Sequence, residues 1–362
     1  MTAAAAQVAA PIATWVERRT GQERPITVLI VDDSAVARAA LSHMVGGGEA
    51  LALAGAVESA ARAIAWLGAN RVDVILLDLE MPGWNGLAAL PELLAVGRGA
   101  KVFVVSSAAR AGAEATLRAL AAGAADTLAK PAVGQLNQAF QAILVDRIER
   151  LGRASLHDID LAQFVLRPEP STPIGLLGIG ASTGGLSGLA TFFAELPRSF
   201  TAPIVVTQHL PPAFMPYFAD QLAAMSGRLA HIAEEGRRIL SGEIAIAPGT
   251  RHLSVLRQGT HFVASLSDRA TPTRCCPSVD PMLESIADAA GVQAAAVILT
   301  GMGRDGTEGA TRMVAAGGSV LVQDRATSAV WGMPGSVAKA GLACVAASPS
   351  QLAASVARRG SV

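Results

Sequence analysis

Short apolar runs alternate with helix-like segments from residue 26 to about residue 150, and this alternation strongly constrains the fold. The runs span residues 26–31, 51–57, 72–77, 101–105 and 125–128. Runs of this length, rich in Val, Ile and Leu, predict buried strands. Five successive βα units predict an α/β fold with a doubly wound (βα)5 parallel sheet, whose ligands bind beyond the carboxyl ends of the strands.

Acidic residues follow two of these runs, and a hydroxyl and a lysine follow two others. Asp32 and Asp33 come directly after the first run, and Asp78 follows the third. Three carboxylates at one sheet edge repel one another unless a divalent cation holds them, and Mg²⁺ prefers oxygen ligands of this kind. Ser106 and Lys130, at the ends of the fourth and fifth runs, complete a predicted site for a phosphoryl group.

The composition limits the class of protein. The chain has 362 residues, enough for two or more domains. Lys and Arg number 29, as do Asp and Glu, so the formal net charge of +0 predicts no nucleic-acid partner and no attraction to an anionic membrane surface. The three cysteines, Cys275, Cys276 and Cys344, are too few for a disulfide framework and indicate a reducing compartment.

Neither the N-terminal segment nor any apolar stretch predicts a membrane segment. Residues 1–24 are alanine-rich and have no basic residue ahead of their apolar part, which is the wrong order for a secretory signal. The longest uncharged stretch, 171–194, is interrupted by Gly, Ser and Thr, which suits a protein core better than a spanning helix. We therefore expect a cytoplasmic protein with no direct membrane insertion and a flexible N-terminal extension.

The alternation stops after residue 150. Pro168, Pro170 and Pro173 exclude a helix there and favour an extended tether. The predicted organisation is an extension at 1–24, a first domain at 25–150, a linker at 151–173 and a second α/β domain, with a mostly parallel sheet, at 174–362.

The second domain opens with a glycine-rich stretch, residues 178–185, between an apolar run at 174–177 and a helical pattern at 186–196. Its G-x-S-x-G pattern matches a nucleophile elbow, in which small residues allow a sharp turn that exposes the hydroxyl of Ser182. The amide of Thr183 would point toward the same space and could stabilise an oxyanion. Two alternatives are an ordinary βα turn and a dinucleotide fingerprint; the latter is weak, because Thr183 holds the third glycine position.

A histidine and an aspartate follow two other predicted strands of this domain. His209 comes after the run at 203–206, and Asp305 lies just past the run at 294–299. Ser182, His209 and Asp305 would then share one sheet edge, as a nucleophile, its base and the acid that orients the base require. The alternatives are that His209 is structural in a proline-fixed turn, and that Asp305 caps a helix together with Glu308.

The first domain resembles bacterial response-regulator receiver domains. The resemblance is carried by VDDS at 31–34, LDLEMP at 77–82 and KP at 130–131. It implies that a histidine kinase phosphorylates Asp78, that Asp32, Asp33, Asp78 and the backbone of Glu80 bind Mg²⁺, that Ser106 is the switch hydroxyl, and that Lys130 contacts the phosphoryl group. Thr127 departs from the pattern, because such domains often carry an aromatic residue there.

The second domain resembles the chemotaxis protein-glutamate methylesterase (CheB) family. The matching segments are GASTGG at 180–185, QHLP at 208–211, APGTRH at 247–252, PSVD at 277–280, LTGMGRDG at 299–306 and WGMPG at 331–335. The resemblance implies that Ser182 is the nucleophile, His209 the general base and then acid, and Asp305 the partner of His209. It adds the amides of Thr183 and Met302 as oxyanion donors.

The implied activity is hydrolysis of glutamate methyl esters on chemoreceptors through an acyl-enzyme, without a cofactor, together with deamidation of specific glutamines. The architecture suggests that the unphosphorylated receiver covers the esterase cleft and that phosphorylation of Asp78 loosens the interface. The alternatives are a non-enzymatic response regulator that only docks to receptors and a nucleotide-dependent oxidoreductase.

Overall fold

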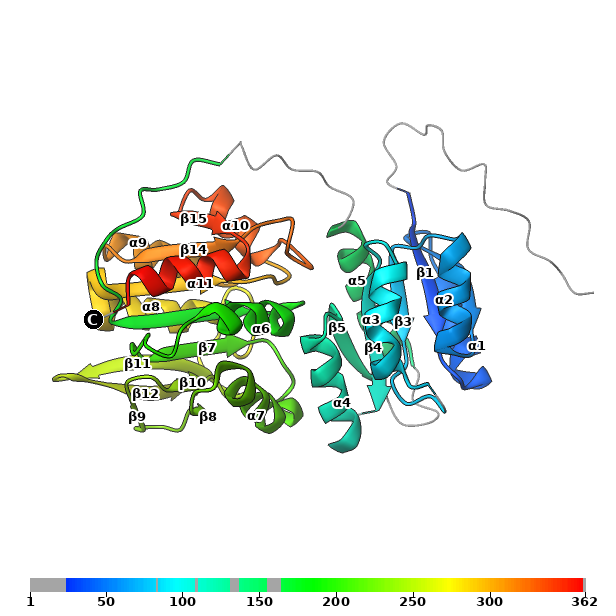
Figure 1. Cartoon of the computed structure of the whole chain (residues 1–362), viewed down its shortest axis with the longest axis horizontal. Helices are drawn as coiled ribbons and strands as arrows, with labels where there is room; N and C mark the ends of the chain where they lie inside the picture. The colour runs from blue at the N-terminus through cyan, green and yellow to red at the C-terminus, as the bar shows by residue number, and fades with distance from the viewer. Residues whose placement is uncertain (1–23, 83, 108–109, 131–136, 155–163, 361–362) are drawn as a thin grey trace, which may run out of the picture.

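The computed structural model describes residues 24–82, 84–107, 110–130, 137–154 and 164–360. Two α/β domains lie side by side in Figure 1. The predicted extension at 1–24 lies almost wholly outside the described residues. None of the helices within the described ranges combines the length and the apolar character needed to cross a bilayer.

The first domain is a five-stranded parallel sheet with strand order β2-β1-β3-β4-β5. This order is the doubly wound arrangement that the five βα units predict. One face packs against α1 and α5, and the other against α2, α3 and α4. The elements are β1 (Ile26–Val31), α1 (Ala35–Gly46), β2 (Leu51–Val57), α2 (Ala60–Ala69), β3 (Val74–Leu77), α3 (Gly86–Val96), β4 (Lys101–Ser107), α4 (Arg110–Ala121), β5 (Asp126–Lys130) and α5 (Gln138–Ala154).

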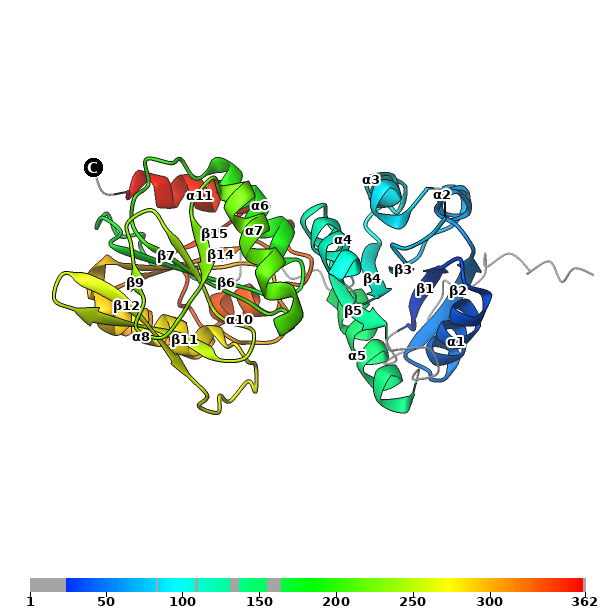
Figure 2. The same cartoon turned by 90° about the horizontal axis from the view of Figure 1, so that it is seen from below.

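The second domain contains a seven-stranded sheet, ordered β15-β14-β13-β6-β7-β10-β8, in which every pair of neighbours is parallel. Helices cover both faces (Figure 2), α6, α7 and α11 on one side and α8, α9 and α10 on the other. The strands are β6 (Leu176–Ala181), β7 (Ile204–Gln208), β8 (Ala230–Ile232), β10 (Ile244–Ile246), β13 (Ala294–Ile298), β14 (Ser319–Gln323) and β15 (Val345–Ala347). The helices are α6 (Gly185–Glu195), α7 (Met215–Ser226), α8 (Val279–Ala290), α9 (Thr307–Ala315), α10 (Met333–Lys339) and α11 (Pro349–Arg358).

A small antiparallel sheet joins the second domain, with strand order β11-β12-β9. It is formed by β9 (Arg238–Ile239), β11 (His252–Gln258) and β12 (His261–Ser267), and its buried face packs against α8. The apolar pattern of the sequence does not predict this sheet, because polar residues interrupt the apolar ones in β11 and β12.

The strand order of the second domain determines where its candidate site residues meet. From β6 the chain adds β7 and β10 on one side, and it later adds β13, β14 and β15 on the other. The order therefore reverses between β6 and β13, and such a switch point opens a crevice at the carboxyl ends of the strands. Ser182 follows β6, His209 follows β7, and Asp305 lies beyond β13, so all three residues border this crevice.

The first strand of this domain differs from its prediction. It spans Leu176–Ala181 rather than 174–177, so two glycines assigned to the turn belong to the strand. A Cβ atom on Gly178 would lie 2.7 Å from Cδ1 of Ile286, and one on Gly180 would lie 2.5 Å from Cγ1 of Val279. These glycines therefore allow α8 to pack closely on the sheet.

The receiver domain contacts the second domain through α4 and β5. Helix α4 packs against α6 and α7, and Nε2 of Gln221 donates a hydrogen bond to the carbonyl of Leu117, 3.2 Å away. Helix α5 runs to Ala154, four residues into the span predicted as the linker. The described end of that span, residues 164–173, has no regular structure. It lies against the second domain, where Arg167 N donates to the carbonyl of Ala343 at 2.9 Å.

Candidate active site

Ser182 lies in a tight turn between β6 and α6. The next-but-one residue, Gly184, caps α6 with φ +76, a left-handed conformation that favours glycine. The amide of Ser182 donates to the carbonyl of Thr300 at 3.1 Å, and the carbonyl of Ser182 accepts from Gly185 N at 2.8 Å. The backbone of Ser182 is thus fixed on both sides, while its side chain remains partly exposed in the cleft.

His209 and Asp305 form a hydrogen-bonded pair. Nε2 of His209 lies 2.8 Å from Oδ2 of Asp305, and the side chains are 19% and 1% exposed. The interpretation of Asp305 as a helix cap is wrong. Helix α9 begins after Gly306, whose φ is +94, and no side chain caps it. The carboxylate instead turns toward the imidazole.

Two residues at the start of α8 hold the carboxylate of Asp305 in place. Ser278 Oγ donates to Oδ1 at 2.6 Å, and the amide of Val279 donates to Oδ2 at 2.7 Å. Burial alone would raise the pKa of Asp305, but the hydrogen bonds from His209, Ser278 and Val279 outweigh it and hold this pKa below its usual value. Asp305 therefore stays ionised and keeps the His209 ring in place. In the sequence, the PSVD segment at 277–280 carries only the family resemblance, and no local pattern predicts its contact with Asp305.

A second buried carboxyl lies beside Asp305. Asp280 is 2% exposed, and its Oδ1 accepts a hydrogen bond from the amide of Gly309 at 2.9 Å. Its Oδ2 is buried and has no hydrogen-bond partner within the described residues. Burial, together with the charge of Asp305, raises the pKa of Asp280 to about 7, against the hydrogen bond from Gly309. The pair accordingly carries one negative charge through most of the acidic range, on Asp305.

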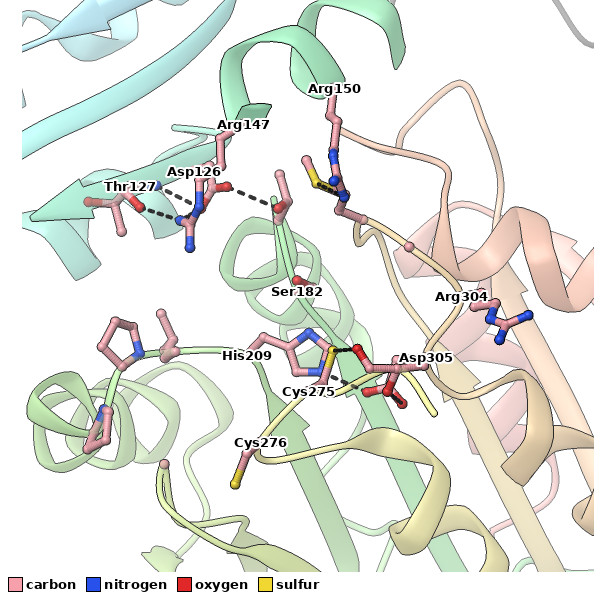
Figure 3. A pocket seen from close by; sticks show the side chains of 18 of the residues that line it. Asp126, Thr127, Arg147, Arg150, Ser182, His209, Cys275, Cys276, Arg304 and Asp305 are labelled. Atoms are coloured by element: carbon pink, nitrogen blue, oxygen red, sulfur yellow. Dashed lines mark hydrogen bonds and ion pairs between the residues drawn. The ribbon is translucent and has the colours of Figure 1, made fainter. Parts of the chain in front are cut away.

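Ser182 and His209 face the same cleft, whose volume is about 640 Å³ (Figure 3). Within the described residues, the hydroxyl of Ser182 makes no hydrogen bond to the imidazole. Because Asp305 engages Nε2 of His209, Nδ1 is the ring nitrogen that remains for a proton from Ser182. Catalytic hydrogen bonds of this kind are often long without substrate and tighten in the complex.

Among the described residues, two backbone amides beside Ser182 have no hydrogen-bond partner. Those of Thr183 and Met302 donate to no acceptor in the part of the chain that the structure describes. The loop that carries Met302 passes beside Ser182, because a Cβ atom on Gly301 would lie 2.9 Å from Cβ of Ser182. Unpaired amides at this point are suited to bind a developing oxyanion.

The receiver domain contacts both residues that carry these amides. The hydroxyl of Thr183 donates to Oδ2 of Asp126 at 3.2 Å, and the carbonyl of Ala125 accepts from Gly184 N at 2.6 Å. Nη1 of Arg150 lies 3.8 Å from the sulfur of Met302. No sequence motif singled out these receiver residues, because their role depends on how the two domains meet.

Asp126 is largely withdrawn from solvent at this contact. Burial raises its pKa, and Arg147, at 3.5 Å, together with hydrogen bonds from the amide of Thr127 and the hydroxyl of Thr183, offsets only part of that rise. Thr127 lies next to it and is 7% exposed, and its carbonyl accepts from Nη1 of Arg147 at 2.8 Å. The residue that replaces the usual aromatic thus lines the cleft between the domains.

The predicted phosphorylation site of the receiver is assembled at the carboxyl edge of its sheet. One carboxylate oxygen each of Asp32, Asp33 and Asp78 lies within 4.8 Å of the others. Nζ of Lys130 donates to Asp32 at 2.8 Å and to Asp78 at 2.6 Å. Burial lowers the pKa of Lys130, but these two carboxylates raise it by more than burial lowers it, so the net shift is upward. Glu80 is exposed, and its amide donates to Oδ1 of Asp78 at 3.1 Å.

Ser106 lies at the end of β4 and is 2% exposed. Its hydroxyl is 2.5 Å from that of Thr116, which itself donates to the carbonyl of Gly112 at 2.7 Å. Ser106 is therefore the donor to Thr116. This bond links the predicted switch hydroxyl to α4, the helix that packs against the second domain.

Comparisons with known proteins match both domains. The family model described as CheB methylesterase matches residues 177–356, and that of the response regulator receiver domain matches residues 28–141. The chain is 37% identical over 357 residues to protein-glutamate methylesterase/protein-glutamine glutaminase 1 of Paramagnetospirillum magneticum, covering 90% of this chain and 93% of that protein. It is 40% identical over 326 residues to protein-glutamate methylesterase/protein-glutamine glutaminase 2 of Caulobacter vibrioides, covering 87% and 93% respectively. A solved structure, the CheB methylesterase catalytic domain of Thermotoga maritima, is 36% identical with a TM-score of 0.49 and covers 51% of this chain and 97% of that chain.

The fold and the site define a response regulator whose output domain is a methylesterase domain built on a parallel sheet. The chain belongs to the CheB methylesterase family.

Proposed function

We propose that this protein hydrolyses γ-methyl esters of glutamate side chains with Ser182, His209 and Asp305 as its catalytic residues. The observation that carries the proposal is the buried 2.8 Å contact between His209 and Asp305 on the edge where Ser182 is exposed. The printed names of the related proteins include both a glutamate methylesterase and a glutaminase activity. Deamidation of glutamine follows the same steps with ammonia in place of methanol as the leaving group.

In the first step, Nδ1 of His209 accepts the proton of Ser182, whose oxygen attacks the γ-carbonyl carbon of the ester. Asp305 keeps Nε2 of His209 protonated, so that Nδ1 is the basic nitrogen. His209 then returns the proton to the methoxide as it leaves. Water activated by His209 hydrolyses the acyl-enzyme and regenerates Ser182.

The amides of Thr183 and Met302 are proposed as the donors to the tetrahedral oxyanion. Each such donor typically lowers the barrier by about 3 kcal/mol. Their freedom from other hydrogen bonds supports this role, because no bond has to break before they bind the oxyanion.

We propose that the substrates are the cytoplasmic domains of methyl-accepting chemoreceptors, and that a histidine kinase supplies the phosphoryl group for Asp78. Asp32, Asp33 and Asp78 would hold Mg²⁺, with help from the Glu80 backbone, since their carboxylate oxygens converge within 4.8 Å. Bound Mg²⁺ would neutralise charge on the incoming phosphoryl group.

The receiver would restrain the esterase by narrowing the cleft and holding the two oxyanion residues. Asp126 holds Thr183, and Arg150 contacts Met302. Phosphorylation of Asp78 would act on this interface through the bond of Ser106 to Thr116 on α4. Release of α4 from α6 and α7 would then open the cleft.

The proposed function is tested by incubating the full-length protein with receptor membranes that carry labelled methyl esters, with and without acetyl phosphate. The wild type should release methanol faster with acetyl phosphate. Ser182→Ala should reduce release by about 10⁴-fold or more. Ser187→Ala, a change in the first turn of α6, serves as the matched control and should retain activity. Undiminished release by Ser182→Ala would refute the mechanism, and no release by the wild type would favour a regulator that only docks.

A further inference from the structure

A thiol lies beside the proposed base and acid of the active site. Cys275 belongs to the loop between β12 and α8 and is half-buried at the edge of the cleft. One donor atom each of His209, Cys275 and Asp305 lies within 4.8 Å of the others. Figure 3 shows Cys275 against the ring of His209, whereas its neighbour Cys276 points away. Acyl transfer by Ser182 requires no thiol, so the hydrolytic steps leave Cys275 without a role.

We propose that His209, Cys275 and Asp305 form a binding site for Zn²⁺, and that Zn²⁺ bound there inhibits the hydrolase. Imidazole nitrogen, thiolate sulfur and carboxylate oxygen are the ligands that Zn²⁺ takes, and three protein ligands leave one coordination position for water. Mg²⁺ prefers oxygen ligands only, so it would not compete well for this set. The receiver cluster of Asp32, Asp33 and Asp78 offers only carboxylate oxygens and therefore suits Mg²⁺ better than Zn²⁺.

Inhibition follows from the proton balance. Binding replaces the thiol proton of Cys275 by the metal and releases one H⁺ to solvent, without any change of oxidation state. A cysteine thiol is ordinarily protonated at neutral pH, so this proton is present when the metal is absent. Zn²⁺ shared with Asp305 binds Nε2 of His209, so the ring proton moves from Nε2 to Nδ1. Nδ1 then has no lone pair to accept the proton of Ser182, and the first step of acyl transfer stops.

Some charged residues around the cleft oppose the binding of Zn²⁺, and others favour it. Arg147, Arg150 and Arg304 line it and disfavour a cation. The carboxylate of Asp305 and the thiolate formed at Cys275 provide two negative charges at the point of binding itself. Because Arg147 and Arg150 belong to the receiver, the first domain opposes the metal as long as it covers the cleft.

The binding test uses Co²⁺ as a spectroscopic substitute for Zn²⁺ on the full-length protein. The wild type should show a thiolate-to-cobalt charge-transfer absorption that Zn²⁺ displaces. Cys275→Ser should lose this absorption, and Cys276→Ser, the adjacent cysteine in the same cleft, should keep it. Absence of the absorption in the wild type, or its persistence in Cys275→Ser, would overturn the proposal. This readout does not depend on catalysis.

The inhibition test rests on the proposed function and is run without a phosphodonor, so that metal effects on phosphorylation do not enter. Each variant is compared with its own metal-free rate of methanol release. Cys275→Ser and Cys275→Ala should need at least about tenfold more Zn²⁺ for half-maximal inhibition than the wild type or Cys276→Ser. Equal sensitivity of all four proteins would refute inhibition at this site. An active wild type that binds Co²⁺ at Cys275 but is not inhibited would refute the inhibitory part alone.

Discussion

The hydroxyl of Thr183 donates a hydrogen bond to Asp126, so a receiver residue holds the residue that follows the proposed nucleophile in sequence. The adjacent backbone is held as well, through the 2.6 Å bond between Gly184 N and the carbonyl of Ala125. The receiver therefore contacts the turn that carries the proposed nucleophile, in addition to lining the cleft beside it. Restraint at this point can alter catalysis as well as access.

Asp126→Ala removes the side-chain part of this contact and should activate the unphosphorylated protein. One hydrogen bond contributes about 0.5–1.5 kcal/mol, so the basal rate of methanol release should rise roughly twofold to tenfold. The rate with acetyl phosphate should change less, because the interface is then already loosened. Glu58→Ala, which removes an exposed receiver carboxylate paired with Arg62, is the control and should leave both rates unchanged. A basal rate of Asp126→Ala equal to that of the wild type would show that this contact does not restrain the enzyme.

Ser278→Ala removes the 2.6 Å hydrogen bond to Oδ1 of Asp305. The carboxylate would then be less firmly oriented toward His209, and we expect kcat to fall about fivefold to thirtyfold, corresponding to roughly 1–2 kcal/mol. KM should change little, because Ser278 is fully buried and does not reach the substrate. Ser226→Ala, which removes another buried serine hydroxyl far from the cleft, should leave kcat intact. A kcat of Ser278→Ala equal to that of Ser226→Ala would argue against a positioning role.

Asp280 should make the stability of the second domain depend on pH. The unfolded chain loses this proton near the ordinary pKa of 3.8, whereas the folded protein keeps it up to about 7. The folded state therefore binds more protons between these values, and the free energy of unfolding should fall as pH rises from 4 to 7. Asp280→Asn should remove most of this fall, as measured by denaturant unfolding at a series of pH values. An equally steep fall in the variant would mean that Asp280 is ionised in the folded protein.

Asp78→Asn should abolish stimulation by acetyl phosphate without lowering the basal rate. The variant removes the proposed phosphoryl acceptor and one of the two carboxylates bound by Lys130. Removal of Mg²⁺ with a chelator should have the same effect on the wild type. Asp73→Asn is the matched control, because this receiver carboxylate pairs with Arg24 at the start of the sheet. Stimulation that survives in Asp78→Asn would place the phosphorylation site elsewhere.

The receiver sheet was predictable because each of its strands is a compact apolar run. Strands β1 and β2 have the predicted limits, and the predicted end-of-strand residues Asp32, Asp78 and Lys130 are joined by hydrogen bonds. In the second domain, three central strands were found, whereas β8, β10, β14, β15 and the antiparallel sheet were not predicted. Strands β8, β9, β10 and β15 have only two or three residues each, which leaves too little periodicity for a pattern to detect.

The order of residues along the chain by itself determined which groups can carry the chemistry. A small-residue turn exposes Ser182, and polar residues that end buried parallel strands must meet at one edge, whatever the details of packing. Only the tertiary structure decided what surrounds them: that Ser278 and Asp280 flank Asp305, that Cys275 lies against His209, and that Asp126 reaches Thr183 from the other domain. These pairs are separated by 25 to 66 residues or face each other across a domain boundary, and no local pattern encodes a distance of that kind.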